Sequence, residues 1–313
     1  MRLRLLAVSS LLALATVASA ADPQLLKLVM PDAKVVSGID IDKVMLTPFG
    51  QFFLNQLPAP DNGFQEFISA TGFDPRRDIH EILMASPADP GKKTGLLLVR
   101  GDFDAGRILS LFTSMGKTPE MYQGVAILSG GPPKKGNGIS EAFAFLDKSI
   151  AVAGDLDSVR GAIGRRNTAG GALDAGLSGK IGTASASQDA WVVSIVPISS
   201  FANAVPNKNV SGALQGDLIK GIQQSSGGVK FGSTIEISGE LTARTDQDAT
   251  SLADVVRFFM NMAQMNSTGH AELGALLKTL TVNTEANAVK VSVAIPEIEM
   301  EMLFKMAHQA PRI

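Results

Sequence analysis

Residues 229–244 alternate between apolar and polar side chains, and this pattern restricts the fold more than any other part of the chain. Apolar side chains such as Ile235 and Leu241 occupy the odd positions, and charged ones such as Glu240 occupy the even positions. A period of two puts the two sets on opposite faces of a β-strand, one buried and one in water. The length predicts one long bent strand, or two strands broken near Gly239.

Residues 289–295 alternate in the same way after an expected turn at 283–287. Strands with one polar face are typical of antiparallel sheets that are covered on one side only. Apolar residues recur with helical spacing from Ile108 to Met115, where Asp104 is the expected N-cap. Similar spacing predicts helices at 48–57, 64–71 and 273–280. The combination predicts an α+β protein.

The order of the expected elements predicts two related halves. Each half contains an opening strand, helical sequence, a strand that leads into an Asp-capped helix, and a final hairpin followed by a short helix. Residues 168–187 are rich in Gly, Ala and Ser, which indicates a flexible connection or a solvated loop. We expect 21–167 and 188–313 to form the halves, each an antiparallel sheet with helices packed mainly on one face. The halves either share a continuous sheet or form separate lobes.

The N-terminus has the three parts of an export signal. Met1–Arg4 is basic, Leu5–Val17 is apolar, and the small residues Ala18 and Ala20 predict cleavage before Ala21. The apolar run is shorter than the ~20 residues that span a bilayer. Later apolar stretches are interrupted by charge or glycine, so no transmembrane anchor is expected once residues 1–20 are removed. We expect an exported bacterial protein, either periplasmic or secreted.

The composition excludes several classes of protein. There is no cysteine, so neither disulfides nor lipid attachment at an N-terminal cysteine is expected. Stability must come from an apolar core, and a chain of 313 residues is long enough to form one. Loss of Arg2 and Arg4 with the signal changes the formal net charge from −2 to −4, and the basic clusters are no longer than pairs. Nucleic-acid binding is therefore not expected.

Two methionine runs are candidates for holding a soft metal, since thioethers bind Cu(I). The first run is Met260, Met262 and Met265, and the second is Met300, Met302 and Met306 followed by His308. On a helix, the first run leaves only a narrow polar strip, which favours a mostly buried helix in which methionine fills gaps. We therefore expect both runs to pack in the core, with no metal and no cofactor.

Histidine chemistry has little support in the sequence. His80-Glu81 begins like a zinc-protease helix, but Met84 stands where the second histidine ligand is required. The segment is also more typical of a strand. His270 and His308 complete the set, and no Gly-x-Ser-x-Gly elbow supports a Ser–His arrangement. Surface or capping histidines are expected, and no catalytic residue is assigned.

Residues 72–78 place Arg76 and Arg77 between two aspartates. Such a pair of arginines either grips an anionic ligand or forms local ion pairs at a turn that follows the helix stop at Gly72. The Asp-Pro step favours the turn with local ion pairs.

Several turn and capping motifs resemble those of a group of uncharacterised exported bacterial proteins, seen especially in acidobacteria-like genomes. The motifs are Thr47-Pro48-Phe49-Gly50, Thr71–Ile79, Val99–Asp104 and Asp155–Arg166. The resemblance covers mainly residues 30–166. It implies an exported two-copy α+β protein, and it assigns no catalytic or binding residue.

These observations lead to three hypotheses of function. The first is an exported, non-catalytic protein that binds an envelope protein partner or an apolar or polymeric ligand, for which a cleft between the halves would supply a site. The second is a secreted hydrolase whose residues converge only in three dimensions. The third is periplasmic metal handling through the methionines.

Structural observations separate these hypotheses. An open apolar groove favours the first hypothesis, and a deep pocket with converging polar groups of shifted pKa favours the second. An open cavity shared by Met260, Met262 and Met265 favours the third. The oligomeric state is left open.

Overall fold

The structure is a computed structural model, and it describes residues 21–56, 61–88, 94–130, 141–168, 173–200, 216–266 and 277–309. The expected signal at 1–20 and the first half of the expected helix at 273–280 lie outside these ranges. The strands are β1 (Val35–Asp40), β2 (Ile79–Ser86), β3 (Leu96–Gly101), β4 (Glu120–Tyr122), β5 (Val125–Ser129), β6 (Glu141–Phe145), β7 (Ile150–Asp155), β8 (Ala190–Ser194), β9 (Ile222–Lys230), β10 (Thr234–Ala243), β11 (Thr281–Glu285) and β12 (Ala288–Pro296). The helices are α1 (Pro23–Leu28), α2 (Ile41–Met45), α3 (Pro48–Gln56), α4 (Asn62–Thr71), α5 (Pro75–Asp78), α6 (Ala105–Ser114), α7 (Leu156–Arg166), α8 (Ala175–Ser187), α10 (Asp217–Lys220), α11 (Asp246–Asn266) and α13 (Glu297–Gln309).

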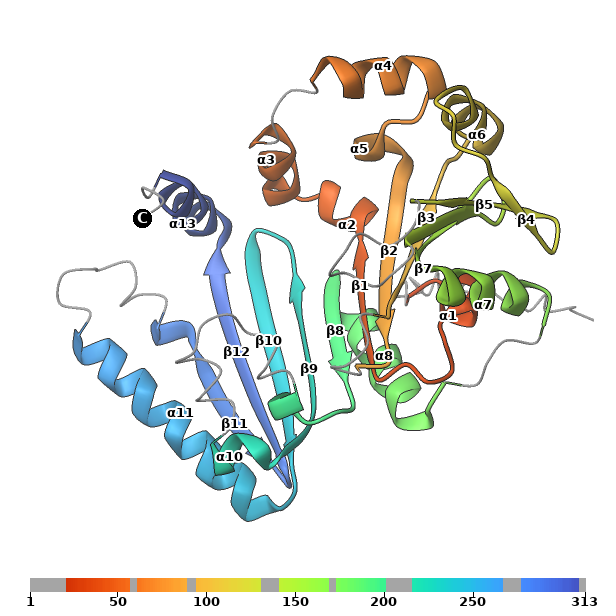
Figure 1. The fold of residues 1–313 in the computed structure, drawn as a ribbon. Helices are drawn as coiled ribbons and strands as arrows, with labels where there is room; N and C mark the ends of the chain where they lie inside the picture. The colour runs from red at the N-terminus through yellow and green to blue at the C-terminus, as the bar shows by residue number, and fades with distance from the viewer. Residues whose placement is uncertain are drawn as a thin grey trace, which may run out of the picture.

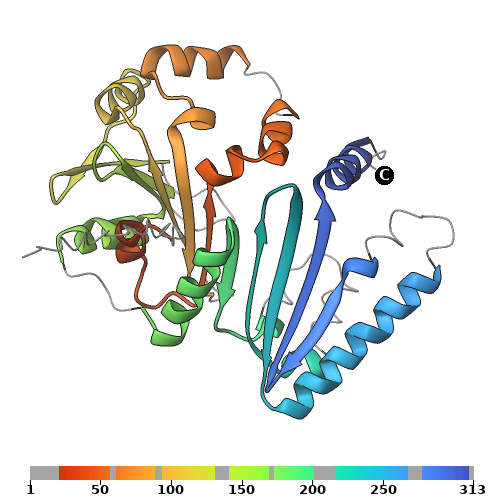
Figure 2. The same ribbon diagram turned by 180° about the vertical axis from the view of Figure 1, so that it is seen from behind.

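The strands of the described ranges form one continuous sheet (Figures 1 and 2). Their order is β11-β12-β10-β9-β8-β1-β2-β3-β7-β6-β5-β4. Every neighbouring pair is antiparallel. The α+β class with an antiparallel sheet is therefore confirmed. Of the two arrangements left open by the sequence, the continuous sheet is the one observed.

The junction between the early and the late strands is the pair β1–β8. In its register Val36 faces Val193 and Gly38 faces Trp191. On the early side the order continues β1-β2-β3-β7-β6, and on the late side it continues β8-β9-β10-β12-β11. The hairpin β4–β5 follows only on the early side.

Helices cover both faces of the sheet. The expectation that they pack mainly on one face of each half is wrong for 21–167, because α1 and α7 lie on one face and α6 lies on the other. On one face, residues of α1, α7 and α8 join Val36, Leu83 and Val193 in the main core. On the opposite face, α6 packs with Phe145 and Ala151 of β6 and β7, and α11 packs with Val289 of β12. We call these the core face and the groove face. Alternation along a strand identifies its two sides, but the connections decide which side each helix covers.

The Gly/Ala/Ser-rich segment is not a flexible connection or a solvated loop along its whole length. Residues 175–187 form helix α8, whose start is capped by Asp174 through the backbone N–H groups of Gly176 and Leu177, at 2.9 and 3.1 Å. Leu177 and Ile181 of this helix are fully buried in the main core. Two large apolar residues four apart are sufficient to anchor a helix whose other residues are small.

The alternating segment at 229–244 forms two strands, which is one of the two sequence predictions. The break between them does not lie near Gly239, where it was expected. Strand β9 ends at Lys230 and β10 begins at Thr234, so Gly239 is inside β10 rather than at a break. The buried positions of β10 are odd, among them Ile235 and Ala243. The expected helices at 48–57 and 64–71 are α3 and α4, and α4 ends at Gly72 with a left-handed φ of 76°.

Helices α3 and α13 lie at the same end of the sheet (Figures 1 and 2). Phe49 stacks on Phe231, with ring centroids 5.8 Å apart, and Phe304 meets Phe49, Phe52 and Phe53 edge to face. This cluster ties the region between β1 and β2 to the late strands. None of the helices that the structure describes combines the length and the apolar character needed to cross a bilayer.

Gly38 is required at the centre of the sheet because Trp191 lies against its backbone. A Cβ atom at Gly38 would stand 2.6 Å from Cζ2 of Trp191 and 2.6 Å from Cδ2 of Leu83. We predict that Gly38→Ala lowers the free energy of unfolding by about 1–3 kcal/mol, the typical penalty of overpacking. Urea denaturation followed by tryptophan fluorescence measures it, since Trp191 is the single tryptophan of the chain.

Gly179→Ala is the matched control, because a Cβ at this helical position of α8 meets nothing within 4 Å. It should leave the stability unchanged or raise it by up to about 1 kcal/mol through helix propensity. Equal destabilisation by both substitutions would contradict the packing explanation.

Candidate ligand-binding groove

A cavity of about 830 Å³ opens on the groove face, over strands β1, β2, β3, β7, β6 and β5. Its floor is a row of side chains that face one another across successive strands: Ser37, Met84, Leu97, Ala153, Phe143 and Leu128. Strands lie about 4.8 Å apart, so the row extends over about 24 Å. The size is typical of a cavity that holds a small organic molecule.

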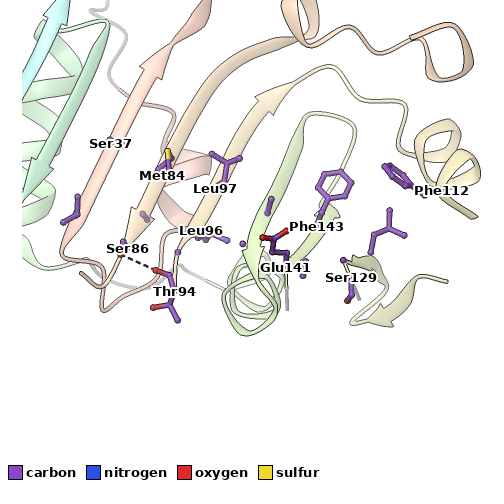
Figure 3. A pocket seen from close by; sticks show the side chains of 18 of the residues that line it. Ser37, Met84, Ser86, Thr94, Leu96, Leu97, Phe112, Ser129, Glu141 and Phe143 are labelled. Atoms are coloured by element: carbon purple, nitrogen blue, oxygen red, sulfur yellow. Dashed lines mark hydrogen bonds between the residues drawn. The ribbon is translucent and has the colours of Figure 1, made fainter. Parts of the chain in front are cut away.

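The floor exposes apolar surface to solvent. Met84 is 58% exposed, although it projects from a central strand, and Val192, opposite Ser37 on β8, is 45% exposed. Phe112 of α6 and Phe143 of β6 form the aromatic end of the cavity (Figure 3). The internal strands of a sheet are normally covered by other elements. Apolar side chains that are exposed on such strands therefore indicate a binding surface.

Polar groups stand at the rim of the groove. Lys117 and Glu141 are the ionisable side chains that line it. Ser86 donates a hydrogen bond from its Oγ to the carbonyl oxygen of Thr94 at 3.3 Å (Figure 3). The hydroxyl oxygen Oγ1 of Thr94 is buried and has no hydrogen-bond partner within the described ranges. A buried hydroxyl without a partner is unfavourable.

Sequence reasoning did not find this groove. It expected a cleft between the halves, whereas the lining residues lie between Val35 and Gly154. The signal that was available is the run Leu96–Val99, which is apolar on both faces of β3. A strand with two apolar faces requires cover on both sides, and here the cover on the groove face is incomplete.

His80 lies outside the groove, on strand β2 as the sequence predicts. Its Nδ1 is 3.0 Å from Oδ1 of Asp42, and its Nε2 is 3.3 Å from Oδ2 of Asp102. Hydrogen bonding to Asp42 raises the pKa of the imidazole, and the bond to Asp102 acts in the same direction against partial burial. A partly exposed histidine between two carboxylates is suited to link α2 with the end of β3.

Residues 72–78 form local ion pairs, as the turn interpretation predicts. Arg76 pairs with Asp74 at 2.9 Å, and Arg77 pairs with Asp78 at 2.6 Å. The hydrogen bonds from these guanidinium groups hold the pKa values of both carboxyls below their usual range. Asp74 also caps α5, so the segment fixes the entry into β2.

The methionine runs are less buried than expected. Met262 and Met302 are 43% and 40% exposed, so packing in the core is wrong for these two residues. Neither run lines the groove. The side chains of Met265, Met306 and His308, and all of His270, lie outside the description. In the described ranges, no group of three or more His, Cys, Asp or Glu side chains is placed to hold a metal ion.

Comparison with known proteins gives a likeness of fold alone. No protein-family model matches the chain, and no curated protein matches its sequence. The solved structure described as crystal form III of TP0453 superposes with a TM-score of 0.51 at 8% identity, covering 90% of this chain and 97% of that one. Crystal form I of TP0453 gives a TM-score of 0.48 at 9% identity, covering 92% and 99%. The first likeness shows a shared fold and transfers no residue or activity.

The contacts of His80 predict a pH-dependent contribution to stability. A histidine whose pKa is raised on folding stabilises the protein fully below its unfolded value of about 6.5, and the contribution disappears as the pH rises through the folded value. His80→Gln should therefore lower the midpoint of urea unfolding at pH 5.5 and leave it nearly unchanged at pH 9. Asp42→Asn should reduce this pH dependence. An imidazole pKa in NMR that stays at 6.5 and does not respond to Asp42→Asn would refute the assignment.

Proposed function

We propose that this protein is an exported, non-catalytic binding protein that holds an apolar ligand in the groove. The observation that carries the proposal is the floor of six cross-strand neighbours from Ser37 to Leu128, whose centre is apolar and open to solvent. Burial of apolar surface stabilises a complex by about 25 cal/mol per Å² before the costs of association. Met84 and Leu97 supply such surface at the middle of the floor.

The ligand that fits best is elongated and apolar. It would lie along Met84, Leu97 and Phe143. An envelope protein could present the same chemistry through an exposed apolar segment. We favour a small ligand because the cavity has walls at Phe112 and at Gly95–Gly154, rather than an extended flat surface.

The arrangement of ionisable groups gives the hydrolase hypothesis little support. His80 and Glu81, whose pKa values are raised, lie outside the groove. A catalytic base must reach the bound substrate directly or through one water. Metal handling through the methionines lacks support for a similar reason, since Met260 and Met262 do not line the groove.

Two further parts of the proposal concern origin and location. We infer that the protein is a duplicated unit, and the support is the parallel between β1-β2-β3-β7-β6 and β8-β9-β10-β12-β11, with a helix after β3 and after β10. Export to the periplasm or the exterior is supported by the pattern of residues 1–20. Kinship with the exported bacterial group remains a prediction from the motifs.

The groove predicts binding of an uncharged apolar probe, N-phenyl-1-naphthylamine, which fluoresces in apolar surroundings. Met84→Glu puts a charge in the middle of the floor, and it should weaken binding of the probe about tenfold or more, equivalent to about 1.4 kcal/mol. Fluorescence titration of the mature protein measures the dissociation constant.

Met121→Glu is the matched control, because Met121 of β4 is also a strand methionine, is 66% exposed, and lies outside the groove. It should change the dissociation constant less than twofold. Displacement of the probe by 1-dodecanol should occur in the wild type and weaken in Met84→Glu. Equal effects of the two substitutions, or no binding by the wild type, would contradict the proposal.

A further inference from the structure

The chain immediately after the predicted cleavage site is buried rather than free. Ala21 is only 6% exposed and belongs to the main core. Helix α1 follows at once, and hydrogen bonds hold its C-terminal end. Lys27 donates to the carbonyl oxygen of Arg166 at 3.2 Å, and Arg165 donates to that of Leu28 at 2.8 Å. The position of Ala21 is therefore set by the fold.

Glu81 lies beside this segment, at the end of the core face. The backbone N–H of Asp22 donates to both carboxylate oxygens of Glu81, at 3.1 and 3.3 Å. Successive backbone nitrogens are at most about 3.7 Å apart. The nitrogen of Ala21 is therefore within about 7 Å of the Glu81 carboxylate.

The cations near Glu81 are engaged by other carboxylates. Asp40 and Arg100 face Glu81 from the neighbouring strands β1 and β3. Arg100 donates to Asp22 at 2.8 Å and also to Ser149 and Gln24. Lys43 pairs with Asp40 at 3.1 Å. No Lys, Arg or His of the described chain forms an ion pair with Glu81.

With these neighbours, ionisation of Glu81 is unfavourable as long as the nitrogen of Ala21 is a neutral amide. Burial raises the pKa of Glu81 to about 7, and the charges of Asp22 and Asp40 act in the same direction. The hydrogen bond from Asp22 and the charge of Arg100 oppose this shift without cancelling it. A partly buried carboxyl in this setting keeps its proton unless one more positive charge lies nearby.

We propose that cleavage after Ala20 creates that charge: the new α-ammonium of Ala21 binds the Glu81 carboxylate and locks α1 onto the sheet. Hydrolysis of the Ala20–Ala21 peptide bond leaves a carboxylate on the removed peptide and an amine on Ala21, which takes up a proton. The site would thus distinguish the processed protein from any form that carries residues before Ala21.

The test compares two forms of the protein, one beginning at Ala21 and one with Gly-Ser added before it, each with Glu81 or Glu81→Gln. In the form that begins at Ala21, the substitution removes an ion pair, and the unfolding equilibrium constant at pH 7 should rise about tenfold or more. In the extended form, Glu81→Gln removes a carboxyl that has no cationic partner, and the unfolding equilibrium constant should fall. This reversal of sign is the expected result.

The two forms should also differ in pH dependence. A carboxyl whose pKa is raised on folding makes stability fall between its unfolded and folded values, so the extended form should lose stability from about pH 4.5 to about pH 7. The form that begins at Ala21 should keep its stability over this range. There the stability should fall only as the ammonium deprotonates, above its usual pKa of about 7.7–8.0.

Glu66→Gln is the control, because Glu66 is an exposed residue of α4 far from this site in sequence and fold. It should have the same small effect in both forms. Should the extended form fail to fold, the pKa of the Ala21 amine in the processed form decides, and Glu81→Gln should lower it by about one unit. An unchanged amine pKa, or the same sign of the Glu81→Gln effect in both forms, overturns the proposal.

Discussion

The antiparallel pairing of β1 with β8 is the interaction on which the rest of this structure depends. It joins strands that are separated by most of the early chain into one sheet, and it puts the buried residues Val36 and Val193 opposite each other. Trp191 covers Gly38 across the same ladder, where no larger residue fits. Without this ladder, the core beneath α8 would open to water, because α8 packs on both strands that it unites.

The groove is a consequence of how the helices divide the sheet between them. On the core face, α1, α7 and α8 cover the central strands, and the packing there is continuous. On the opposite face, α6 and α11 cover separate regions and leave Met84 and Val192 exposed between them. Central strands are normally covered by other elements, so exposed apolar side chains there indicate a surface that contacts another molecule. Binding of an apolar ligand explains this exposure with the fewest additional assumptions.

A cluster of ionisable residues lies away from the groove. Asp22, Asp40, Glu81 and Arg100 meet where α1 reaches the ends of β1, β2 and β3. This cluster holds the segment that begins at Ala21, whereas the ionisable side chains that line the groove in the described ranges are Lys117 and Glu141 at its rim. Substitutions at Glu81 and at Met84 therefore change two separate parts of the molecule, and the proposals made for them can be tested independently.

Local sequence patterns predicted many of the strands and helices. Alternation at 289–295 predicted β12, and Asp104 predicted the start of α6, because capping and period-two burial are local effects. Local patterns misjudged α8, whose small residues resemble a loop but whose Leu177 and Ile181 enter the core. They also misjudged Met262 and Met302, since amphipathic spacing does not reveal whether a partner covers the apolar side. Only the tertiary structure decided which helices cover each face, that one sheet is continuous, and that the floor from Ser37 to Leu128 stays open. These properties arise from pairing between residues far apart in the chain, which no local periodicity encodes.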